Sequence, residues 1–214
     1  MAKQVRERPR RAYSSPIRQA QAGETRRAVV SAARKVFTGS GYAAATVEAV
    51  AVAAGVSVPT IYAVFGSKPA LLSAVVADTG SDSDIRALVD RVLGEVEPRA
   101  RLAGAARVVR TIMQRESNIL ELLEEAGTGN PELAAASRQA HEQQRQALGR
   151  VLRPLHEQKA LRRDLHLAEA VATFSALASP ECYRLLVGEL GWSGARWERW
   201  LGESAARLLL SENR

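Results

Sequence analysis

The stretch VAVAAGVSVPTIYAVFGSK, from Val50 to Lys68, decides the fold of this chain. It contains one charged residue, Lys68, although 25% of the 214 residues are charged. Gly55 separates two short apolar segments, and Ser57 is a good N-cap for the second, with Pro59 in its first turn. Two short helices joined by a turn that contains glycine are typical of a helix-turn-helix unit.

The two predicted helices, residues 46–54 and 58–65, each have a side suited to a small core, marked by Val50, Ile61 and Phe65. The other side of the second helix carries only small, neutral or hydroxyl-bearing side chains, namely Val58, Pro59, Thr60, Tyr62 and Ala63. A helix with such a face can enter the major groove of DNA, which is about 12 Å wide, and contact the base edges. We therefore interpret this stretch as half core and half contact surface.

The rest of the sequence favours an all-α fold. Ala, Leu, Arg and Glu are abundant and aromatic residues make up only 5%, a balance that favours helices over strands. Caps and apolar periodicity predict further helices near residues 24–38, 68–77, 83–96, 98–113, 116–127, 131–158, 167–178, 179–191 and 193–210. Short helices thus come first and longer ones follow.

The excess positive charge is confined to the N-terminal end. Residues 1–78 contain eleven Lys and Arg residues against four acidic ones, whereas residues 79–214 contain nineteen of each. Residues 1–22 lack apolar periodicity and carry two prolines, so we expect a flexible basic arm there. A basic segment attached to a neutral body indicates a polyanionic partner, either nucleic acid or an anionic membrane.

Several other classes of protein find no support in the sequence. No apolar run approaches the ~18 residues of a membrane span, and the single cysteine, Cys182, fits a reducing cytoplasm, so we expect a cytoplasmic protein without membrane contact. The spacing of His141, His156 and His166 matches no metal site. Neither a phosphate-binding glycine loop nor a nucleophile elbow occurs. We predict no enzyme, no catalytic residue, no metal and no cofactor.

The segment TVEAVAVAAGVSVPTIYAVFGSKPALLSAVV, residues 46–76, resembles the DNA-binding domain of TetR-family transcriptional regulators. AGVS, TIY and FGSK, followed by two leucines, occur in the order and spacing of that family. The preceding AARKVFTGSGYAAATVEAVA is similar to its first helix and turn, and the likeness covers about residues 24–76. The C-terminal segment LASPECYRLLVGELGWSGARWERWLGESAARLLL also resembles the end of many such regulators.

The resemblance implies roles for individual residues in DNA binding. Thr46 and Tyr62 are expected to offer hydroxyls to phosphates, and Lys68 to meet a phosphate at a helix N-terminus. A separate hypothesis, based on the basic arms of other DNA-binding proteins, is that the arm with Arg10 and Arg11 enters a neighbouring minor groove.

The resemblance also places the start of the second helix, residues 57–60, nearest the bases. Two positions depart from the common pattern of the family. Val64 stands where many members carry His or Tyr, so the phosphate contact of those members cannot be carried over. Pro59 stands where Gly or Arg is frequent, so no base preference can be carried over.

By resemblance we expect a three-helix helix-turn-helix DNA-binding domain over residues 23–67 and a larger helical domain over residues 68–214 that binds an effector and dimerises. The implied function is that of a homodimeric repressor on a double-stranded operator with an inverted repeat. A small apolar or amphipathic effector would release it. The candidate pocket residues, which suit a plain core equally well, are Met113, Leu120, Leu123, Phe174 and Leu177.

Two questions stay open from the sequence. Trp197 and Trp200 share a predicted helix face with Leu201, Ala205 and Leu208, and core or dimer packing explains them better than ligand contact. The alternative function is a basic helical adaptor that binds anionic surfaces or protein partners. That alternative leaves the neutral face of residues 58–65 unexplained.

Overall fold

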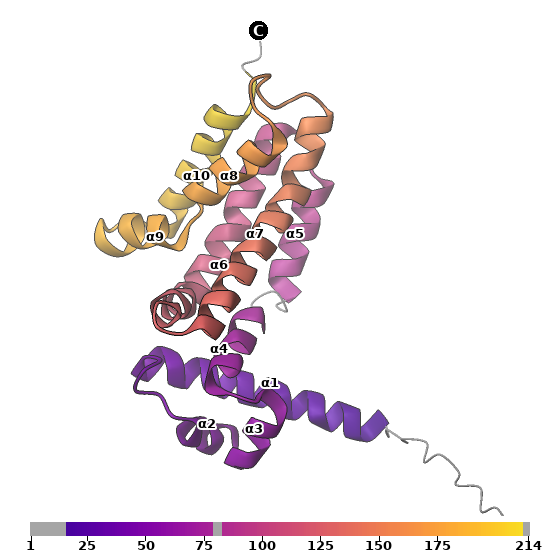
Figure 1. Cartoon of the computed structure of the whole chain (residues 1–214). Coiled ribbons are helices and arrows are strands. Elements are labelled where there is room, and N and C mark those ends of the chain that lie inside the picture. The colour runs from indigo at the N-terminus through magenta and orange to yellow at the C-terminus, as the bar shows by residue number, and fades with distance from the viewer. Residues whose placement is uncertain (1–15, 79–82, 212–214) are drawn as a thin grey trace, which may run out of the picture.

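The computed structural model describes residues 16–78 and 83–211, and these residues are predominantly helical (Figure 1). Within them there is no β-strand, only an isolated antiparallel bridge between Leu161 and Leu210. The prediction of an all-α fold is therefore confirmed. The elements in chain order are α1 (Pro16–Ser40), α2 (Val47–Ala54), α3 (Val58–Phe65), α4 (Lys68–Ala77), α5 (Ser83–Gly94), α6 (Pro98–Gly127), α7 (Pro131–Glu157), α8 (Leu167–Leu177), α9 (Pro180–Tyr183), the π-helix η2 (Arg184–Glu189) and α10 (Gly194–Leu209).

α1 begins earlier than the sequence pattern predicts. It starts at Pro16, so residues 16–22 belong to a helix and not to the expected flexible arm. Proline is well tolerated at the first helical position, and the Gln and Ala residues of this segment favour helix. Residues 1–15, including Arg10 and Arg11, lie outside the described residues.

α6 is one continuous helix of 30 residues where the sequence pattern predicts two. The expected break falls between Met113 and Glu116. Gln114 and Arg115 in between are good helix formers, and no Gly or Pro stops the helix there. A second difference concerns residues 179–191, where a single turn of α-helix, α9, continues as η2.

The first four helices pack around one apolar cluster. Phe37 of α1, Val50 of α2 and Ile61 of α3 belong to it, and each is at most 1% exposed. α4 adds Leu71 and Leu72, which are fully buried in the same cluster. α4 therefore packs with α1 and α3 on one side and with α6 and α7 on the other, and the expected domain boundary between residues 67 and 68 stays a prediction.

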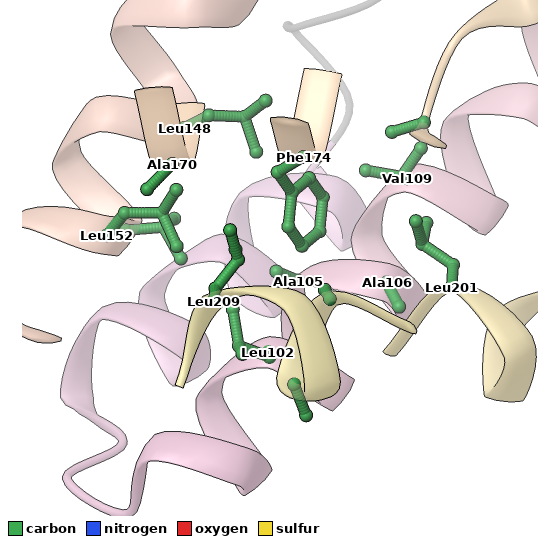
Figure 2. Packing of buried hydrophobic residues seen from close by; sticks show 14 of the residues in the cluster. Leu102, Ala105, Ala106, Val109, Leu148, Leu152, Ala170, Phe174, Leu201 and Leu209 are labelled. Atoms are coloured by element: carbon green, nitrogen blue, oxygen red, sulfur yellow. The ribbon is translucent and has the colours of Figure 1, made fainter. Parts of the chain in front are cut away.

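α5 to α10 form a larger helical body on the other side of α4 (Figure 1). Figure 2 shows its core, in which the Phe174 ring of α8 lies among side chains such as Leu148 of α7 and Val109 of α6. On α10, Trp197 is fully buried in this core, whereas Leu208 is 43% exposed. The face predicted for α10 thus supplies Leu201 and Ala205 to the core as well, and dimer packing stays a prediction for Leu208.

The two cores meet where α1 and α4 pack against α6 and α7. Arg34 of α1 forms an ion pair with Glu116 of α6 and donates to the Val75 carbonyl of α4 at 2.9 Å. Burial lowers the pKa of Arg34. The Ser67 hydroxyl donates to the Glu132 carboxylate of α7 at 3.1 Å. Polar contacts thus link the helix-turn-helix side of the molecule to the larger helical body.

Two features that bear on function are absent from the described part of the chain. No single helix there is long and apolar enough to cross a membrane, although α2 and α3 together, bent by 104°, pass the same test of length and composition. Among residues 16–78 and 83–211, no group of three His, Cys, Asp or Glu side chains is arranged to hold a metal ion.

Candidate DNA-binding interface

α2 and α3 form a helix-turn-helix, and the chain bends by 104° between them, within the range of that motif. The Thr46 hydroxyl caps α2 by accepting the Ala49 N–H at 3.1 Å. The Ser57 hydroxyl caps α3 by accepting the Thr60 N–H at 3.3 Å. Gly55 in the turn has a φ of +66°, which glycine adopts without steric penalty. The predicted cap at Ser57 is therefore confirmed.

The exposed side of α3 is uncharged. Pro59, Ala63 and Val64 are exposed, and Tyr62 exposes 46% of its surface. The opposite side of the helix is buried in the N-terminal core. α3 therefore presents small and apolar groups, with one phenol, to any partner that approaches this side.

Two of the predicted contact residues are less accessible than the sequence suggests. Val58 is partly buried and packs against the N-terminal core. Thr60 is also partly buried, and its hydroxyl lies 2.8 Å from that of Ser57. The hydroxyl of Thr60 is thus engaged in the cap of its own helix.

Lys68 lies against the loop that precedes α2. Its ammonium group is 4.4 Å from the centroid of the Tyr42 ring and donates to the Ala43 carbonyl at 3.5 Å. Burial lowers the pKa of Lys68. Because Ala43 is three residues before Thr46, these contacts bring the lysine to the loop that leads into the Thr46 cap. Thr46 and Lys68, both predicted to contact phosphates, thus come from segments that contact each other.

Arg26 of α1 is a further cation beside α3, and the sequence pattern does not reveal it. Its guanidinium lies 4.7 Å from the centroid of the Phe65 ring at the end of α3, and the residue remains exposed. Thirty-nine positions separate the two residues, so no local pattern could indicate this contact. Arg26 therefore lies at the end of α3, whereas Lys68 lies at the loop before α2.

The five predicted effector-pocket residues are divided between the two cores. Met113 and Phe174 are buried in the C-terminal core, and Leu120 and Leu177 pack against it. Leu123 belongs to the N-terminal core, because the long helix α6 passes both. Shallow hollows between α1 and α6 and between α6 and α10 are lined by other residues.

Comparison with known proteins shows which family the helix-turn-helix resembles. The family model described as "Bacterial regulatory proteins, tetR family" matches residues 29–75, which include α2, α3 and most of α1 and α4. The chain carries a TetR-family DNA-binding domain. In helix-turn-helix proteins the second helix of the unit, here α3, is called the recognition helix.

Solved structures extend the likeness to the remaining helices. A TetR-family regulator from Rhodococcus sp. is 19% identical, with 87% of this chain and 99% of that chain covered and a TM-score of 0.73. A transcriptional regulator from Saccharomonospora viridis, in complex with choline, is 21% identical, with 89% and 100% covered and a TM-score of 0.68. SmeT, the repressor of a multidrug efflux pump of Stenotrophomonas maltophilia, is 16% identical, with 89% and 94% covered and a TM-score of 0.63. No curated protein matches the sequence.

The chain therefore has the TetR-family fold over the 87% to 89% of its length that these structures cover, and the resemblance found in the sequence is confirmed. The predicted order of a helix-turn-helix domain followed by a larger helical domain is confirmed as well. TetR-family regulators are transcription factors without enzymatic activity, which agrees with the prediction that this chain is not an enzyme.

Proposed function

We propose that the chain is a homodimeric repressor that binds an operator with an inverted repeat and leaves it when a small apolar or amphipathic effector binds. The observation that carries this proposal is the uncharged, exposed side of α3, a helix capped by Ser57, with Arg26 at its end and Lys68 at the loop before α2. Such a helix fits the major groove, while cations beside it attract phosphates. A cytoplasmic location follows from this function.

The outward surface of α8 and α10 supports a homodimer. Ala168, Ala172 and Ala176 are exposed on α8 at a spacing of four residues. Trp200 is partly exposed and Leu208 43% exposed on α10, which packs beside α8 (Figure 1). Small and apolar side chains on two adjacent helices suit close packing against a second copy. Two copies related by a twofold axis would present two α3 helices to an inverted repeat.

Release by an effector is supported by the character of the larger domain. Residues 79–214 carry equal numbers of basic and acidic residues around a largely apolar core. The similar regulator from S. viridis binds choline, and SmeT represses an efflux pump. An effector can shift this chain away from DNA only if it binds the non-binding conformation more tightly. We propose Met113, Leu120, Phe174 and Leu177 as the side chains that it displaces.

The proposal is tested by selecting random duplex DNA with the full chain, at low and at near-physiological salt. We expect enrichment of an inverted repeat that persists at the higher salt concentration, because contacts with bases do not depend on released counterions. Salt-sensitive binding without any enriched sequence would instead assign binding to charge alone and favour the basic adaptor.

Removing single groups beside α3 is expected to weaken operator binding without loss of folding. Tyr62→Phe removes one hydroxyl and is expected to lower operator affinity about ten-fold, the effect of one hydrogen bond to a charged group. Lys68→Ala is expected to reduce the slope of log affinity against log salt by about 0.9 for each phosphate that the chain no longer neutralises. Binding is measured by fluorescence anisotropy, and folding by circular dichroism.

The matched control is Arg153→Ala, which removes an exposed positive charge from α7 in the C-terminal body. It should leave both the operator affinity and the salt slope close to those of the unchanged chain. If Lys68→Ala behaves like Arg153→Ala, the phosphate role of Lys68 is incorrect.

A further inference from the structure

The recognition helix carries none of the side chains that form paired hydrogen bonds with bases. Arg and Lys pair with guanine, Asn and Gln pair with adenine, and Asp and Glu accept from cytosine. Residues 57–67, from the cap of α3 to the cap of α4, include none of these six residue types. If α3 distinguishes base pairs, it must do so through other contacts.

The exposed side of α3 presents apolar groups at helical spacing. Pro59 and Ala63 are four residues apart, as are Thr60 and Val64, so these four share one side of the helix, which we name the outer face. Val64 exposes 40% of its surface, and Pro59 and Ala63 are exposed. Thr60 is partly buried, and its hydroxyl lies 2.8 Å from that of Ser57, within the cap of α3.

We propose that the outer face recognises its operator by apolar contact with the C5-methyl groups of thymine. Thymine is the only standard base that shows a methyl group in the major groove, and Ala and Thr methyl groups are among its usual protein contacts. Arg26 at the end of α3 and Lys68 at the loop before α2 are the cations that we assign to phosphates, and contacts with phosphates carry no sequence information. We therefore assign the selection of sequence to the outer face. This inference rests on the proposed function and names the class of DNA that the chain selects.

Hydroxyl groups at the border of the outer face are the competing source of specificity. Ser57 is exposed, and Tyr62 exposes 46% of its surface. A hydroxyl can bond to thymine O4, which uracil also carries, whereas uracil has no methyl group for an apolar side chain to contact. Replacing thymine with uracil therefore separates the two kinds of contact.

The test uses the full chain and the operator enriched from random duplexes, with each thymine of a half-site replaced in turn by uracil. We expect affinity to fall about four-fold at every position that the outer face contacts, the effect of one buried methyl group. At the same positions, 5-methylcytosine should bind more tightly than cytosine, because it restores the methyl group in the major groove.

Two variants assign the methyl contacts to individual residues. With Val64→Ala or Pro59→Ala, the uracil penalty is expected to fall below two-fold at one position per half-site and to stay four-fold at the others. With Tyr62→Phe, overall affinity falls but every uracil penalty remains.

The outcomes distinguish this inference from the function on which it rests. An enriched operator that binds equally well with uracil overturns methyl recognition and leaves the proposed function intact. A uracil penalty that neither Val64→Ala nor Pro59→Ala reduces assigns the methyl contacts to another part of the chain and also overturns it. If no sequence is enriched, the proposed function fails, and the inference fails with it.

Discussion

Replacing Trp197 with alanine is expected to lower the free energy of unfolding by about 4 kcal/mol, the usual loss for a buried large aromatic residue. Trp197 is fully buried and is among the largest side chains in the C-terminal core. Its ring meets that of Tyr183 edge to face, with 4.9 Å between the centroids. Truncation removes this ring pair and leaves a cavity that the long, closely packed helices α6 and α10 cannot close.

Trp200→Ala is the matched control, because Trp200 lies on the same helix but is partly exposed. Its ring contacts Trp192 at a centroid distance of 6.1 Å, and we expect a decrease of about 1 kcal/mol. Unfolding is followed by circular dichroism in urea at several protein concentrations, since a dimer makes the midpoint depend on concentration. Equal decreases for the two variants would contradict the burial-based account of Trp197.

The local features of the helix-turn-helix could be predicted from the sequence because each depends on neighbouring residues. Thr46 and Ser57 cap helices that begin at the next position, and Gly55 provides the positive φ of the turn between them. The burial of Ile61 and Phe65 could be predicted because the two apolar residues recur at helical spacing. These short-range relations also carry the TetR-family likeness, which explains why the sequence alone indicated the family.

Contacts between distant segments could not be predicted in this way. Apolar periodicity shows which side of a helix is buried but does not show against which neighbour. Met113 and Leu123 both lie on the buried side of α6, yet they are about 15 Å apart along its axis and join different cores. The positions of Arg26 over Phe65 and of Lys68 over Tyr42 likewise depend on the tertiary fold.

The ion pair between Arg34 and Glu116 joins the two parts of the molecule, and removing one partner is expected to cost about 2 to 3 kcal/mol. The side chains are only 24% and 11% exposed, so a single substitution leaves the other charge poorly solvated. Breaking a fully buried pair costs about 3 to 5 kcal/mol in this way, and the partial exposure of Arg34 lowers that figure. Arg34→Met additionally removes the hydrogen bond to the Val75 carbonyl.

A double-mutant cycle measures the coupling within this pair. Arg34→Met combined with Glu116→Leu removes both charges, so the combined destabilisation should be smaller than the sum of the single effects by about 2 kcal/mol. The comparison pair is Arg145 and Glu142 on α7, which are 2.8 Å apart but about half exposed. Its coupling should stay below about 0.5 kcal/mol, because water screens the charges and the long side chains lose entropy on pairing. Equal coupling in the two cycles would mean that burial does not strengthen the ion pair between Arg34 and Glu116. The contact between α1 and α6 would then depend on apolar packing alone.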